Sequence, residues 1–131
     1  MLAYYVFLIP AMILGIDLGL YKVFYPLDKI VHTFSGVLTA FGAKELLEYG
    51  KGVRKGWVAK MFCMGVVALV AVLWEVFEFS YDQIFHGNMQ QLIVTGVEDT
   101  MWDMIMALIG AMIVVVVIFN DKVVKELTKG N

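Results

Sequence analysis

The segment Trp57–Phe79 reads WVAKMFCMGVVALVAVLWEVFEF, and its length and composition decide the fold. A helix needs about 20 mostly apolar residues to cross the hydrocarbon core of a bilayer. This segment meets that requirement, with Lys60 near its start and the carboxylates of Glu75 and Glu78 near its end. It therefore predicts a membrane-spanning helix that places two acidic side chains where the chain enters or leaves the lipid.

The composition of the whole chain also predicts a membrane protein. Apolar residues make up 61% of the 131 residues, and the mean hydropathy is +0.81, whereas soluble domains are typically about 45–50% apolar. The length suits one domain, so we expect residues 1–131 to form a single transmembrane domain in contact with the lipid bilayer. The chain has no long run of basic residues, which argues against a nucleic-acid partner.

Three further segments have the length and apolar character of spanning helices. We therefore expect an all-α polytopic membrane protein, folded as a four-helix transmembrane bundle, in which the second span is the least hydrophobic. The predicted spans are residues 2–20, 29–47, 58–79 and 100–119. The valine-rich run in the last span would favour a strand in water, but a lone strand leaves its backbone unpaired in lipid, so a helix is expected. Residues 81–97 stay open between a short interfacial helix and a re-entrant loop.

The basic residues predict the orientation of these spans. Eight of the ten lie next to the connection between the second and third spans or after the fourth: Lys44, Lys51, Arg54, Lys55, Lys60, Lys122, Lys125 and Lys129. Four spans place both regions on one side of the membrane, and basic residues are enriched on the cytoplasmic side. We therefore expect a multi-pass protein of the cell (inner) membrane with both termini, including the tail 120–131, in the cytoplasm.

The acidic residues gather at the opposite level. Eight of the twelve lie near the outer ends of the predicted spans: Asp17, Asp28, Glu75, Glu78, Asp82, Glu98, Asp99 and Asp103. Residues three, four or seven apart share one face of a helix, so the second, third and fourth spans can each direct a polar stripe inward. Mostly small or polar residues continue these stripes: Ser35, Gly36, Thr39 and Ala43; Gly65, Ala68 and Val72; Met106 and Gly110.

Carboxylates at close range cannot all ionise unless a cation compensates them. Protons, the two nearby lysines (Lys22 and Lys29) or a bound metal can do so, and oxygen ligands with one imidazole suit Mg²⁺, Mn²⁺, Fe²⁺ or Zn²⁺. We expect one or two divalent ions. The predicted metal ligands are Asp28, His32, Glu75, Glu78, Asp82, Asp99 and Asp103, with Glu75 and Glu78 as the catalytic candidates.

Some of these acids also have simpler interpretations. Asp28 follows Pro26 and has the position of a helix cap, and Glu98 lies three residues after Thr95, as in a capping box. Asp82 and Asp99 have the positions of solvated residues at the membrane surface. These alternatives stay open at the level of sequence.

Three motifs together resemble those of a known family. They are Asp28-Lys29-Ile30-Val31-His32, then Leu73-Trp74-Glu75-Val76-Phe77-Glu78, then Asp99-Thr100-Met101-Trp102-Asp103-Met104. Their order and spacing resemble the YjdF-like family of small prokaryotic integral inner-membrane proteins of unknown function, whose members show Asp-x-x-x-His, Glu-x-x-Glu and Asp-Thr-x-x-Asp. The resemblance implies that the acids and the histidine belong together, and that family members carry additional spans. The first motif also resembles VanZ-like membrane proteins, whose later motifs are not evident here.

Three functions remain in competition. In the first, the protein is a metal-dependent membrane hydrolase, in which a metal-bound water attacks a lipid phosphate or another ester and Glu75 or Glu78 is a ligand or general base. In the second, the acids line the path of a cation or proton transporter or channel. In the third, the chain is an accessory subunit whose acids bind a basic partner in a membrane complex or a homo-oligomer.

Overall fold

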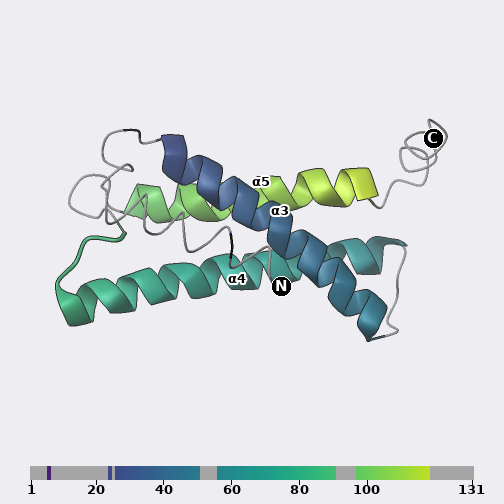
Figure 1. Cartoon of the computed structure of the whole chain (residues 1–131), viewed down its shortest axis with the longest axis horizontal. Helices are drawn as coiled ribbons and strands as arrows, with labels where there is room; N and C mark the ends of the chain where they lie inside the picture. The colour runs from purple at the N-terminus through teal and green to yellow at the C-terminus, as the bar shows by residue number, and fades with distance from the viewer. Residues whose placement is uncertain (1–5, 7–23, 25, 51–55, 91–96, 119–131) are drawn as a thin grey trace.

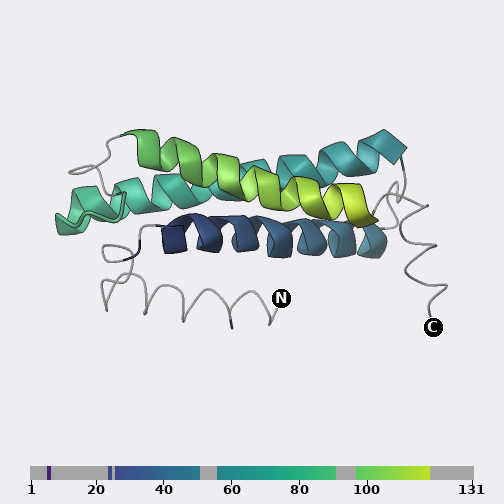
Figure 2. The same cartoon turned by 90° about the horizontal axis from the view of Figure 1, so that it is seen from above.

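The computed structural model describes residues 6, 24, 26–50, 56–90 and 97–118, and the description below concerns those residues. They form three long helices: α3 (Pro26–Tyr49), α4 (Gly56–Phe85) and α5 (Val97–Ile118). Helices α3 and α5 run in one direction and α4 runs back, so the starts of α3 and α5 lie near the end of α4 (Figure 1). Figure 2 shows α5 lying along both of the other helices.

The helices confirm part of the predicted architecture. Helices α3, α4 and α5 cover the second, third and fourth predicted spans. Of these, α4 and α5 are long and apolar enough to cross a membrane, while α3 is the least apolar of the three, as expected. The first predicted span, residues 2–20, lies outside the described residues except for Val6, so the four-helix bundle stays a prediction.

Local sequence signals account for the helix ends. Pro26 begins α3, where a missing N–H costs no helical hydrogen bond. The backbone of His86, immediately after α4, has a φ of 52°, a left-handed conformation that commonly terminates a helix. Residues 86–90 are therefore not helical, and the choice between an interfacial helix and a re-entrant loop now concerns residues 91–96, which are not described.

Small residues let α3 and α5 approach closely. A Cβ atom built on Gly36 of α3 would overlap the carbonyl oxygen of Ala107 in α5, and one built on Gly110 of α5 would overlap the carbonyl oxygen of Thr33 in α3. The adjoining core is formed by small and branched side chains: Ala40, Ala43, Cys63, Val67, Ala107, Ala111, Val114 and Val115. This contact is the close approach that small residues permit between membrane helices.

The inward face of α4 differs from the predicted one. Gly65 and Val72 are exposed and Ala68 is half-buried, whereas Val67 and Cys63 are buried. The inward line runs from Glu75 in steps of four residues through the half-buried Ala71 to the buried Val67, Cys63 and Ala59. Helices that cross at an angle, as α3 and α4 do in Figure 1, pack along such ridges, and the ridge in use cannot be chosen without the partner helix.

The Gly36 contact gives a first prediction. Gly36→Ala should lower the free energy of unfolding by about 1–3 kcal/mol, the usual cost of overpacking, because the added methyl group meets backbone that cannot rotate away. Gly42→Ala is the matched control, since a Cβ at Gly42 meets nothing within 4 Å. Denaturation of the detergent-solubilised variants measures both changes. Equal stability of the two variants would show that α3 and α5 are not in backbone contact.

Candidate functional site

The first two turns of α3 bring three candidate side chains to the junction with α5. Asp28 and His32 are four residues apart and share a face, and Lys29 lies between them in sequence. The side chain of Asp28 is 8% exposed and that of His32 is 12% exposed. A carboxylate in the first turn is favoured by the helix dipole, so Asp28 stabilises the start of α3 while it faces the neighbouring helix.

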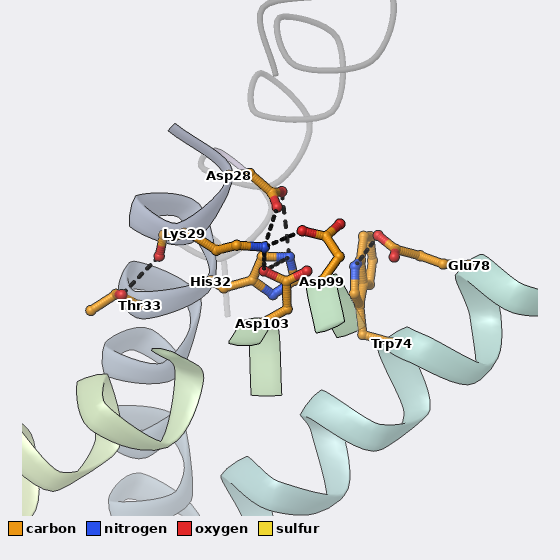
Figure 3. Close-up of polar contacts among 8 residues, drawn as sticks. All are labelled: Asp28, Lys29, His32, Thr33, Trp74, Glu78, Asp99 and Asp103. Atoms are coloured by element: carbon orange, nitrogen blue, oxygen red, sulfur yellow. Dashed lines mark hydrogen bonds and ion pairs between the residues drawn. The ribbon is translucent and has the colours of Figure 1, made fainter. Parts of the chain in front are cut away.

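The ammonium group of Lys29 lies among three aspartates (Figure 3). Its Nζ atom donates to Asp28 Oδ2 at 3.0 Å, Asp99 Oδ1 at 2.5 Å and Asp103 Oδ1 at 2.6 Å. Asp99 and Asp103 are one turn apart at the start of α5, and both are buried. An ammonium group has three N–H donors, so one lysine can bind all three carboxylates and join α3 to α5.

His32 extends this cluster on its α3 side. Its Nε2 atom lies 3.7 Å from Asp28 Oδ1 and 3.7 Å from Asp103 Oδ1. One ligand atom from each of Asp28, His32 and Asp103 can be chosen so that all three lie within 4.8 Å of one another. Two carboxylates and an imidazole at this separation are a donor set that first-row divalent metals accept.

Helix α4 contributes two buried glutamates. Glu75 is 7% exposed, and its Oε2 atom accepts no hydrogen bond from the residues that the structure describes. Thr100 of α5 lies within hydrogen-bonding reach of this carboxyl group, and the charges of Asp28, Asp99 and Lys29 act on it. Glu75 therefore faces the cluster formed by α3 and α5.

Glu78 is held by its own helix. Trp74 Nε1 donates to Glu78 Oε1 at 2.7 Å, one turn away, and the Trp74 ring lies between Asp99 and Glu78 in Figure 3. The charges of Glu75, Asp103 and Asp28 still act on Glu78. Glu78 thus differs from Glu75 in having a fixed indole donor on its own helix.

Asp82 has a structural role that differs from the predicted one. Its Oδ1 accepts the backbone N–H of Met89 at 2.7 Å, and its Oδ2 accepts that of Gln90 at 3.0 Å. Both carboxylate oxygens thereby hold the segment after α4 against the helix. Because these oxygens already bind amides, we do not include Asp82 in the metal site proposed below.

The remaining predicted residues are placed as follows. Glu98 is exposed at the start of α5, and its capping interpretation stays a prediction because its expected partner Thr95 lies outside the described residues. Asp17 and Lys22 also lie outside them. The structure thus brings together Asp28, His32, Asp99 and Asp103, as expected, and Glu75 faces that group.

Sequence reasoning underestimated Lys29. Lys29 was expected only as one of two lysines near the acids, because a residue next to Asp28 is rotated by about 100° around the helix and is not expected to share the face of Asp28. Its four-carbon side chain nevertheless reaches back to the acids, as long lysine side chains can. The motif Asp-Lys-x-x-His contained the signal, since it places a cation beside the first acid.

The cluster carries a large formal charge. Asp28, Asp99, Asp103, Glu75 and Glu78 contribute five negative charges when ionised, and Lys29 contributes one positive charge, which leaves −4 with neutral His32. Buried like charges at this spacing oppose ionisation unless a cation or protons compensate them. The site therefore has room in its charge balance for one or more cations besides Lys29.

Apolar helices that enclose a buried ionic cluster are the features of a helical membrane protein with an internal polar site. The chain belongs to the family described as predicted membrane protein (DUF2238), whose family model matches residues 1–122. This confirms the resemblance that the three motifs indicated. An uncharacterized protein of Thermotoga maritima is 32% identical over 113 residues, which are 84% of this chain and 56% of that protein. The chain thus spans about half the length of this relative. No solved structure matches the chain.

Asp82 provides a second prediction. Asp82→Ala should remove the acceptors of two backbone amides and raise the local opening of residues 86–90, at a cost of about 1–3 kcal/mol. Hydrogen exchange followed by mass spectrometry measures this as faster exchange at Met89 and Gln90. Gln83→Ala, an exposed change on the same helix, should leave exchange unaltered. Unchanged exchange in Asp82→Ala would mean that this carboxylate does not hold the segment.

Proposed function

We propose that this protein is a multi-pass membrane protein that binds a divalent cation through Asp28, His32 and Asp103 and uses it to hydrolyse a phosphoester. The observation that carries the proposal is the group of three ligand atoms within 4.8 Å of one another at the α3–α5 junction. Mixed oxygen and imidazole ligands favour Mn²⁺, Fe²⁺ or Zn²⁺, and Mg²⁺ is suited by the carboxylates. The residual charge of the cluster supports the same proposal, because a divalent ion would halve it.

The position of the site supports a substrate at the membrane surface. Asp28 is in the first turn of α3 and Asp99 is in the first turn of α5. Helices that cross a bilayer begin near its headgroups, so a lipid phosphate, or another phosphoester at the surface, is the substrate class within reach.

The chemistry assigns different tasks to the two glutamates. A bound divalent ion supplies Lewis-acid activation of a phosphoryl oxygen or of water. Glu75 is the better general base, because its Oε2 accepts no hydrogen bond from any described residue, whereas Glu78 binds the Trp74 indole. Glu78 then serves as a second-ion ligand or as a charge that orients the site.

The packing beyond the site disfavours a transport function. Below the acids, the interface of the three helices is filled by the apolar core that includes Ala40, Val67 and Ala111. Ion pathways through membrane proteins are lined by polar groups or water-filled cavities. Helix α3 provides half-buried hydroxyl side chains here, such as Thr39, but the described residues of α4 and α5 add none beside this core, which is too little for a continuous path. A binding or catalytic site therefore fits better than a channel.

The metal proposal is tested on the full chain, purified in detergent without chelators. Wild type and Glu98→Gln should each retain about one divalent ion per chain, while Asp103→Asn should bind it about tenfold more weakly or worse, because it loses a ligand. Mass spectrometry of bound metal and titration with Mn²⁺ measure this. Glu98 is the matched control, as an exposed acid on the same helix.

The same preparations test hydrolysis. Phosphate release from phosphatidic acid vesicles and from p-nitrophenyl phosphate should require metal. The variant Glu75→Gln should release no phosphate, although it should still bind Mn²⁺ at Asp28, His32 and Asp103. Metal-free wild type would overturn the metal site and favour the accessory-subunit hypothesis. Metal binding without phosphate release in any sample would overturn the hydrolase alone.

We also propose the orientation that the basic residues indicate. The tail that follows α5 should be cytoplasmic in the cell (inner) membrane, with the acidic cluster on the opposite side. A reporter that works only in the cytoplasm should be active when fused after Asn131. A reporter that works only after export should be inactive at the same position. The reverse pattern would place the cluster on the cytoplasmic side.

A further inference from the structure

We propose that Lys29 is a tethered competitor for the cation site, so that its ammonium group and the divalent ion are alternative occupants of the same aspartates. This inference rests on the proposed function, because it assumes that a divalent ion binds there. In this inference Lys29 is not a metal ligand, but it sets how tightly the site binds a cation and which cation charge the site prefers.

The shared atom is Asp103 Oδ1. It accepts from Lys29 Nζ at 2.6 Å and also lies 3.7 Å from His32 Nε2. A metal bound to this oxygen at about 2.0–2.6 Å would lie within about 5 Å of Nζ, at the separation where like charges in a buried site repel strongly. The ion and the ammonium therefore cannot both keep their places.

The Glu75 carboxylate gives an independent reason to expect a cation in addition to Lys29. Glu75 is more than nine-tenths buried, and its Oε2 accepts no hydrogen bond from the described residues. The charges acting on it are those of the cluster, from Asp28, Asp99 and Lys29. A buried carboxylate oxygen without a donor is costly, and a cation bound nearby at Asp28, His32 and Asp103 would lower that cost.

Lysine is suited to such an exchange. Its ammonium is a compact point charge on a flexible stem, in contrast to the rigid fork of arginine. The Lys29 side chain is 13% exposed, so it reaches the edge of the cluster. It can leave the three carboxylates by rotating its own side-chain bonds, without moving α3.

The exchange also predicts selectivity by charge. A monovalent ion that displaced Lys29 would replace one positive charge with another and gain little electrostatic energy. A divalent ion would bring twice the charge to the same carboxylates. Lys29 therefore excludes monovalent ions from the site more effectively than it excludes divalent ones.

The test measures Mn²⁺ and Na⁺ binding to the full chain in detergent, in wild type and in Lys29→Met, which keeps much of the side-chain length without the charge. If Lys29 occupies the aspartates at least nine-tenths of the time, Lys29→Met should bind Mn²⁺ about tenfold more tightly or better. It should also be less stable than wild type in chelator and recover with Mn²⁺. Na⁺ should compete with Mn²⁺ in the variant and not in wild type.

Lys44→Met is the matched control, because Lys44 is also on α3 but pairs with Glu48 at 2.8 Å, far along the helix. It should bind Mn²⁺ as wild type does. If Lys29→Met fails to fold, Lys29→Arg replaces it and should bind Mn²⁺ more weakly than wild type, because a bidentate guanidinium holds carboxylates more firmly.

The possible failures are separable. Wild type that binds Mn²⁺, with Lys29→Met binding equally or more weakly, would overturn the competition and leave the metal site intact. The same holds if Lys29→Arg binds as tightly as wild type or more tightly. Absence of Mn²⁺ binding in both wild type and Lys29→Met would overturn the proposed function and this inference together. Mn²⁺ binding in Lys29→Met but not in wild type would overturn the proposed function of the natural chain, and it would still support the competition, because removal of the ammonium group would have opened the aspartates to the ion.

Discussion

The described part of the structure depends on one ammonium group among three buried aspartates. Lys29 lies 2.5–3.0 Å from carboxylate oxygens of Asp28, Asp99 and Asp103, and these contacts join the first turns of α3 and α5. In a low-dielectric interior such contacts are strong, yet each charge must be paired before burial is tolerable. The arrangement therefore fixes the relative position of two helices and still leaves negative charge in excess.

The rest of the packing makes this arrangement possible. Gly36 and Gly110 remove the side chains that would separate α3 from α5, so the polar turns at one end can meet while the small residues below them stay in contact. Helix α4 closes the third side and presents Glu75 to the cluster along the same line that buries Val67. Polar and apolar parts of the interface thus follow from one set of close helix contacts.

The excess of acid connects this structure to a function. A protein that only needed to join two helices could do so with one lysine and one or two carboxylates, whereas this chain buries five acids near a single lysine. Family membership shows that the chain is a predicted membrane protein, but it assigns no chemistry to the site. The donor set of Asp28, His32 and Asp103 is therefore the observation from which metal binding is argued.

The sequence by itself determined the helical class, three of the helices and the family, because apolar length and motif spacing are local properties. It also grouped Asp28 with His32, and Asp99 with Asp103, since residues four apart share a helix face. Only the tertiary structure decided that α4 buries Val67 and exposes Val72, because the ridge in contact depends on how helices cross. It alone placed Lys29 at the centre of the acids, because a long flexible side chain is directed by its partners on another helix and not by its position in the sequence.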